Sequence, residues 1–221
     1  TPGGTPVVAC STTAARRAWP QDTTAAGRLP WLRGTRLQLR EFEPDDVDEL
    51  VRMHADPRLR AHLVDDYPLH QAPVARCFVE RLAPIYRQHE GLGIWRASCP
   101  DRGAFAGWFS LMPMAERPGE VELGARLMPE VWGTGLAIEG AEQLLDHAFD
   151  DLGLSQVIGI CHPDNRSARA VLAAVGFEAD GLARYDYTVT LYHHVGVNVW
   201  RAMRNTPRRT RLRRALRASR T

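Results

Sequence analysis

Glycines and small side chains between residues 132 and 137 form the part of the sequence best suited to bind a phosphate group. The run reads Trp-Gly-Thr-Gly-Leu-Ala, and it separates an expected strand from an expected helix that begins at Leu136. Backbone N–H groups in the first turn of a helix and the helix dipole both favour an anion. Gly133 and Gly135 would let the backbone approach a pyrophosphate closely, and the small Ala137 would keep the first turn open. A tight strand-to-helix turn without a ligand fits the same pattern.

Several other chemistries are excluded by composition. All 28 basic residues are arginine, so the chain offers neither a lysine Schiff base nor the lysine of a Walker loop. A dinucleotide fingerprint is excluded because its third glycine and its acidic residue are missing. The four cysteines, at positions 10, 77, 99 and 161, form no C-x-x-C pair, and we expect reduced thiols, a cytoplasmic protein and no metal site.

Charge is distributed unevenly along the chain. Residues 1–36 carry a net charge of +4, residues 37–200 carry −11, and residues 201–221 carry +9, nine arginines with no acid. The acidic body would raise the local concentration of a cationic partner such as an amine. The Arg-rich tail could contact nucleic acid, phospholipid or the body itself, or it could simply be solvated.

The 221 residues, of which 44% are hydrophobic, suffice for one well-buried core. Residues 1–34 are rich in Thr, Ala, Pro and Gly and are predicted to be a flexible leader. One domain is predicted over 35–204, followed by an Arg-rich tail over 205–221. No apolar run reaches the roughly 18 residues that a membrane-spanning helix needs.

Hydrophobic periodicity predicts a mixed α/β domain with antiparallel strand pairs. Pro84 is expected to weaken or end the second helix, and Gly176 is the expected C-cap of the last one. Strands are predicted at 37–42, 93–97, 104–111, 120–127, 156–161, 185–190 and 195–203, and helices from 44, over 72–88, over 136–151 and over 166–175.

Three segments, residues 35–46, 122–139 and 162–177, follow one another along the chain with characteristic runs of residues. In this order they resemble the GNAT superfamily of N-acetyltransferases, and most closely the branch of ribosomal-protein alanine and serine N-terminal acetyltransferases. Residues 122–139 resemble its acetyl-CoA loop. The run His-Pro-Asp-Asn-Arg-Ser at 162–167, continuing to Val-Gly-Phe at 175–177, is similar to an Asn-led helix of that branch. Thr-Arg-Leu-Gln-Leu-Arg at 35–40, with Pro-Asp-Asp at 44–46, is similar to its first strand and helix.

The resemblance implies a central, mostly antiparallel twisted sheet whose fourth and fifth strands splay apart. The pantetheine arm of acetyl-CoA, the acyl-donor cosubstrate, would lie between these strands and bond to the backbone of Leu127 and Met128. The pyrophosphate would be held by backbone N–H groups of the loop, that is, of Gly133, Thr134, Gly135, Leu136 and Ala137. Asn165 would hydrogen-bond the pantetheine or orient its helix; a plain helix cap is the alternative.

The resemblance also implies roles in catalysis. A neutral amine would attack the thioester, with a backbone N–H near Leu127 polarising the carbonyl. Glu122 is the candidate general base, directly or through water, although it could also be a solvated or substrate-orienting carboxylate. The tyrosine acid of many members is missing here, since residues 170–173 read Ala-Val-Leu-Ala. Ser167 is the substitute candidate acid.

We therefore expect an acetyl-CoA-dependent N-acetyltransferase that acts by direct attack on a primary amine. The acceptor would be a protein N-terminus, for example that of a ribosomal protein, or a small cationic amine. The alternative is a non-catalytic acyl-CoA-binding regulatory module whose tail docks on nucleic acid or a ribosome. Dimers are common in the branch, so a homodimer is a further expectation. Trp95, Trp108 and Phe109 would line the acceptor pocket or belong to the core.

Overall fold

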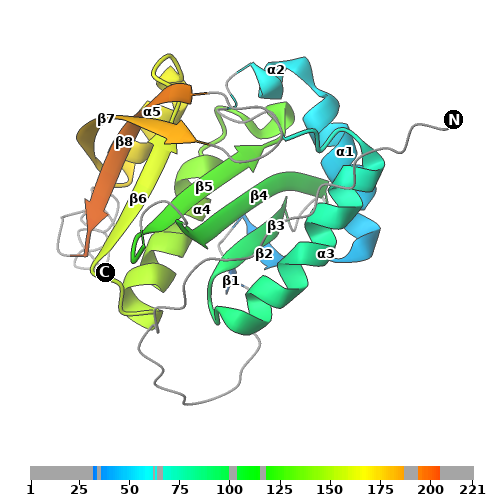
Figure 1. Cartoon of the computed structure of the whole chain (residues 1–221), viewed down its shortest axis with the longest axis horizontal. Coiled ribbons are helices and arrows are strands. Elements are labelled where there is room, and N and C mark those ends of the chain that lie inside the picture. Colours follow the sequence, from blue (N-terminus) through cyan, green and yellow to red (C-terminus); the bar gives the residue numbers. More distant parts are fainter. Residues whose placement is uncertain are drawn as a thin grey trace, which may run out of the picture.

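Eight strands form one central sheet in the computed structural model, which describes residues 32–33, 36–61, 63, 67–99, 104–114, 118–186 and 194–204 (Figure 1). In space the strands follow the order β1-β2-β3-β4-β5-β6-β8-β7. Neighbouring strands are antiparallel except β5 and β6, which are parallel, so the predicted mixed α/β class with a mostly antiparallel sheet is confirmed. The strands are β1 (Leu32–Arg33), β2 (Gln38–Glu41), β3 (Gly93–Cys99), β4 (Ala104–Pro113), β5 (Val121–Leu127), β6 (Gln156–Cys161), β7 (Glu178–Asp186) and β8 (His194–Met203).

Helices cover both faces of the sheet, and each face has its own buried cluster. The 3-10 turn η1 (Pro44–Asp46) and helices α1 (Val47–Ala55), α2 (Pro57–Arg60) and α3 (Ala72–Gln88) pack on one face. On the other face, α4 (Leu136–Asp146), the π-helical turn η3 (His147–Asp151) and α5 (Arg166–Ala174) cover the larger cluster, which includes Phe109 and Phe149.

The predicted hairpin is present as β3 and β4, paired in register with Trp95 opposite Phe109. A bulge at Ala97/Ser98 lies opposite Gly107, whose φ of +126° belongs to the region that favours glycine. A Cβ added to Gly107 would lie 2.1 Å from the carbonyl oxygen of Arg126. Glycine is therefore required where β4 passes closest to the end of β5.

Pro84 does not interrupt α3, which runs without a break from Ala72 to Gln88. The expected weakening is overridden by the buried face of the helix, where Ala75, Val79 and Leu82 pack against the sheet. Tertiary burial of this kind outweighs the hydrogen bond that a proline removes.

One expected strand boundary is wrong, and the short elements β1 and α2 were not predicted. β7 begins at Glu178, seven residues before the predicted start, because Gly181 (φ +98°) and a register shift between Ala179 and Leu182 break the alternation that a regular strand shows. β1 precedes the predicted start of the domain at residue 35, and α2 was missed because it has only four residues. The Arg-rich tail over 205–221, and the leader before residue 32, lie outside the described residues.

Candidate active site

The parallel strands β5 and β6 separate towards their C-terminal ends. Within the described strands they share a single register pair, Glu122 with Ile158. The other edge of β6 is paired with β8 along its whole length. We call the diverging halves, residues 122–127 and 158–161, the β5–β6 fork, and Figure 1 shows the two arrows moving apart. The splayed pair expected from the sequence is thus present.

Alternate backbone N–H groups of β5 point towards the fork, and that of Leu127 is the last of them. The Met128 N–H donates to the Ala106 carbonyl on β4 at 2.9 Å, which makes Leu127 and Gly107 a non-hydrogen-bonded pair. The N–H of Leu127 consequently points away from β4, on the side of β6. The Met128 carbonyl accepts from the Val131 N–H at 3.0 Å. Of the two residues expected to bond pantetheine, Leu127 therefore directs its N–H into the fork, whereas the backbone groups of Met128 are used within the protein.

The glycine loop leads directly from the fork to the N-terminus of α4. After the short 3-10 turn η2 (Pro129–Val131), Gly133 and Gly135 take φ values of +75° and +85°. The first helical bond runs from the Glu139 N–H to the Gly135 carbonyl, so the N–H groups at positions 136–138 precede it. A Cβ added to Gly133 would meet nothing within 4 Å, so the space over this glycine is open.

Two side chains hold this loop in shape. The indole Nε1 of Trp132 donates to the Leu127 carbonyl at 2.9 Å, which ties the loop to the end of β5, although the residue stays 48% exposed. The hydroxyl of Thr134 donates to the Val131 carbonyl at 2.6 Å. Neither contact uses the N–H groups of Gly133 or Gly135, and the loop keeps the arrangement that favours an anion.

Arg36 lies against this loop, a position that the sequence analysis did not predict. Its backbone N–H and its Nε donate to the two carboxylate oxygens of Glu139 at 2.9 and 3.0 Å, and its Nη1 donates to the Thr134 carbonyl at 2.9 Å. These partners are 103 and 98 residues away along the chain. Local patterns carry no signal of such pairing.

Glu122 lies half-buried on β5, between Met112 on β4 and Ile158 on β6. Side chains alternate along a strand, so Glu122 shares a face with Gly124 and Arg126. Arg126 contacts His54 of α1, which identifies this face as the one that α1 and α3 cover. Glu122 is thus on the face opposite α4.

A charged group joins Glu122 on that face. Nη1 of Arg126 lies 3.1 Å from Nε2 of the fully buried His54, whose Nδ1 lies 2.9 Å from the Leu50 carbonyl. A guanidinium can only donate, so Nε2 accepts in this contact, and the tautomer with its proton on Nδ1 fits both contacts. The Arg126 guanidinium also stacks 5.1 Å above the Trp108 ring.

Trp108, like Trp95 and Phe109, is buried in the core, as one of the two interpretations predicted.

The Asn-led helix is α5, and Asn165 caps it. Its Oδ1 accepts from the Ala168 N–H at 3.0 Å, which is the hydrogen bond of a helix N-cap. Ser167 is exposed in the first turn of α5, and Ala168 is the neighbour that packs against the core.

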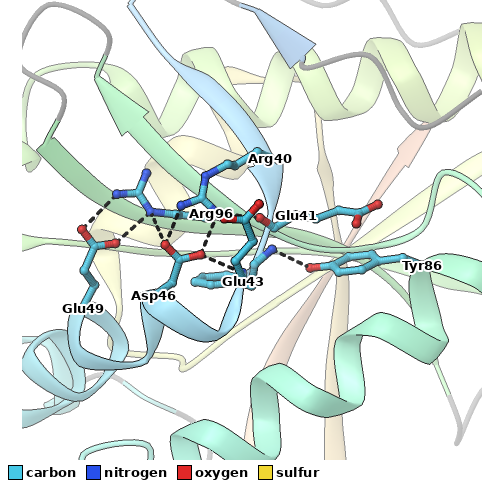
Figure 2. Close-up of polar contacts among 8 residues, drawn as sticks. Arg40, Glu41, Glu43, Asp46, Glu49, Tyr86 and Arg96 are labelled. Carbon is cyan, nitrogen blue, oxygen red and sulfur yellow. Dashed lines mark hydrogen bonds and ion pairs between the residues drawn. The ribbon is translucent and has the colours of Figure 1, made fainter.

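A buried ionic network supports the strands beside the site (Figure 2). Arg40 of β2 bonds both oxygens of Asp46, the nearer at 2.5 Å, and this hydrogen bonding raises the pKa of Arg40. Arg96 of β3 bridges Asp46 at 3.1 Å and Glu49 of α1 at 2.8 Å. The network fixes η1 and α1 to the sheet.

Tyr86 of α3 adds a second tie to the same strands. Its hydroxyl donates to the Ile94 carbonyl and accepts from the Phe42 N–H at 3.2 Å. Figure 2 shows Tyr86 beside the ionic network. Burial raises the pKa of this phenol well above its ordinary value of 10.0. The hydroxyl therefore stays protonated and keeps α3 attached to β2 and β3.

In the part of the chain that the structure describes, no three His, Cys, Asp or Glu side chains are grouped so that they could hold a metal ion. Over the same residues, none of the helices has the length and apolarity to cross a membrane.

Comparison with known proteins agrees with this geometry. Residues 36–178 match the model of the family described as "Acetyltransferase (GNAT) domain". A curated relative, the FsC-acetyl coenzyme A-N(2)-transacetylase of Aspergillus fumigatus, is 38% identical over 93 residues, covering 39% of this chain and 39% of that protein. The uncharacterized N-acetyltransferase YoaA of Bacillus subtilis is 23% identical over 156 residues, covering 71% of this chain and 87% of the relative.

Solved structures share the fold. The RimL ribosomal L7/L12 alpha-N-protein acetyltransferase in complex with coenzyme A superimposes with a TM-score of 0.62 at 18% identity, covering 77% of this chain and 95% of that one. At this identity the likeness concerns the fold alone.

Proposed function

The chain belongs to the acetyltransferase (GNAT) domain family, and we propose that it transfers the acetyl group of acetyl-CoA to a primary amine by direct attack in a ternary complex. The observation that carries the proposal is the continuity of the β5–β6 fork with the glycine loop. The fork supplies a backbone donor at Leu127, and the loop supplies the N–H groups at the start of α4. A thioester at the fork and a diphosphate at the loop would suit the two ends of this path.

The residues present fit the coenzyme. The open space over Gly133 leaves room for a diphosphate close to the backbone, and positive φ values at Gly133 and Gly135 turn the loop so that α4 begins beside it. In this proposal Gly133, Thr134, Gly135, Leu136 and Ala137 form the phosphate end of the site.

Acetyl-CoA supplies the activated acetyl group as a thioester. The N–H of Leu127 would donate to the thioester carbonyl oxygen and stabilise the negative charge that develops there. A single donor of this type is worth roughly 10²- to 10³-fold in rate where it has been removed from other enzymes. Asn165 keeps its role as the cap of α5 and thereby positions the strand-to-helix turn that follows β6.

Glu122 is proposed as the general base. It lies on the face of β5 that α1 and α3 cover, near the start of the strand that ends at Leu127. This carboxylate would take a proton from the acceptor ammonium, directly or through water, and the neutral amine would then attack the thioester. Ser167, which is exposed, is proposed as the general acid. Its contribution would be small, because a thiol leaves readily near neutral pH.

The acceptor is proposed to be a protein N-terminus or a small cationic amine. The net charge of −11 over residues 37–200 favours a cation, and a neighbour in fold is named for an alpha-N-protein substrate. The proposal also includes a cytoplasmic location, a homodimer, and a contact between the Arg-rich tail and nucleic acid.

Acetyl-CoA-dependent release of free thiol tests the proposal, with N-terminal peptides, polyamines, amino acids and aminoglycosides as acceptors. Glu122→Gln should lower kcat by about a hundredfold and leave the Kd for CoA nearly unchanged, because a general base contributes roughly 10²- to 10⁴-fold. The activity of the variant should recover as pH rises, since the free amine becomes abundant. Glu80→Gln, an exposed carboxylate on α3, is the matched control.

Different results separate the alternatives. Turnover by Glu122→Gln at the wild-type rate would refute the assignment of the base. Tight CoA binding by the wild type without turnover on any amine would favour the non-catalytic regulatory module. If the wild type did not bind CoA at all, both functions would be wrong.

A further inference from the structure

We infer that Arg36 binds the diphosphate of the coenzyme, and that Glu139 is the positioning residue that holds its guanidinium against the glycine loop. The inference rests on the proposed function and extends it to a residue far from the loop in sequence. It starts from a charge problem at the phosphate end of the site.

The loop carries no cation of its own. Residues 129–138 contain one charged side chain, that of Glu130, and the next residue is Glu139 in the first turn of α4. Two carboxylates so close to a helix N-terminus would oppose the binding of a diphosphate. Glu130 is paired with Arg58 of α2 at 3.4 Å, so the carboxylate that still needs a partner at this end of the site is that of Glu139.

Arg36 supplies the missing charge. Its Nε and backbone N–H occupy both oxygens of Glu139, a carboxylate whose side chain is only 11% exposed. The carboxylate is therefore neutralised by a partner that enters from the start of β2. Because Arg36 itself is half exposed, the ion pair adds little to stability, and its main consequence is the placement of the guanidinium.

The guanidinium is fixed at two points and still has donors to offer. Nε is held by Glu139, and Nη1 is held by the Thr134 carbonyl within the loop itself. Nη2 makes neither contact, and it lies 3.5 Å from the position of a Cβ added to Gly135. The Arg36 side chain is 51% exposed, so an anion on the loop can reach it. A fixed fork loses little entropy on binding and matches phosphate oxygens in pairs.

The competing explanation is that the Arg36–Glu139 pair is a structural staple, an ion pair whose effect is to hold β2 against α4. Such a staple would affect every substrate of the enzyme equally. A diphosphate contact would affect only ligands that carry the diphosphate, and its contribution would fall as ionic strength rises. These two differences decide the experiment.

Calorimetry on the full chain would give Kd for CoA and for 3′-dephospho-CoA at low and moderate salt, for the wild type, Arg36→Gln and the control Arg87→Gln. Arg87 is an exposed arginine near the end of α3. We expect Arg36→Gln to raise the Kd of both ligands by the same factor, about tenfold, because one charge-assisted hydrogen-bond pair on an exposed group is lost. The salt dependence of Kd should become shallower in this variant.

Turnover of S-acetylpantetheine, which lacks the phosphates, gives the second readout. Its kcat/KM should be the same for Arg36→Gln and the wild type. Glu139→Gln should weaken CoA binding less than Arg36→Gln does and should keep the steeper salt dependence, because the charge of Arg36 remains. If Arg36→Gln fails to fold, Arg36→Lys replaces it: this variant keeps the charge but loses the fork, and its Kd for CoA should be higher than that of the wild type.

Three results would overturn the inference. One is an unchanged Kd for CoA in Arg36→Gln, and another is a loss that vanishes with 3′-dephospho-CoA, which would move the contact to the 3′-phosphate. The third is an equal loss with S-acetylpantetheine, which would make Arg36 a structural staple. In each case the wild type still binds CoA; failure of the wild type to bind would instead refute the proposed function.

Discussion

Gly140 controls how closely α4 packs on the sheet, and replacing it tests the placement of the glycine loop. A Cβ at this position would lie 2.2 Å from Cζ of Phe109 and 2.6 Å from Cε1 and Cε2. Phe109 is fully buried, so the ring cannot swing into solvent. Overpacking of this severity costs about 3 kcal/mol, and alanine returns about 1 kcal/mol of helix propensity. Gly140→Ala should therefore destabilise the protein by about 2 kcal/mol.

Urea denaturation followed by circular dichroism measures this loss, and a second variant isolates its cause. In Phe109→Leu the ring that the new methyl group meets is absent, so adding Gly140→Ala to that background should cost nothing or stabilise the protein. The coupling between the two sites should reach about 2 kcal/mol. The Kd for CoA should rise in Gly140→Ala and return towards the wild-type value in the double variant, because α4 carries the loop at its N-terminus. Wild-type stability of Gly140→Ala would refute this account of the packing.

Three further predictions concern the surroundings of the site. Asp46→Ala should lower the free energy of unfolding in urea by about 3 kcal/mol, because it leaves the buried Arg96 with one acidic partner; a loss below about 1 kcal/mol would contradict the network. Native-state alkylation with peptide mapping should modify the exposed Cys77 and spare Cys161, since burial raises the pKa of the Cys161 thiol; equal rates would oppose this. Tyrosine in the unfolded chain ionises near pH 10, whereas Tyr86 in the folded protein stays protonated. The stability contributed by its phenol is therefore complete below pH 10 and is lost as the pH rises above it. The free energy of unfolding of Tyr86→Phe should fall less steeply at alkaline pH, and an unchanged slope would count against the assignment.

Local patterns predicted the parts of the site that are local in the chain. The turn at Gly133 and Gly135 and the helix start at Leu136 could be predicted from the residues of the turn and the first helical turn alone. The buried strand β6 could be predicted from the length of its apolar run. The start of β7 was missed because Gly181 imitates a turn inside a strand. Arg36 was missed because its position depends on how β2 and α4 pack, which no pattern along the chain encodes.

The two faces of the sheet favour direct transfer over a covalent acyl-enzyme. The glycine loop belongs to α4 on one face, whereas Glu122 lies on the other face under α1 and α3, so coenzyme and acceptor can be bound at the same time. A relay through a thiol would need a reactive cysteine at the fork. Among the described cysteines, Cys161 is the one on a strand of the fork, and burial raises its pKa and so lowers its thiolate fraction. A ternary complex with simultaneous occupation of both faces is therefore the expected route, and initial-rate kinetics should give intersecting rather than parallel double-reciprocal lines.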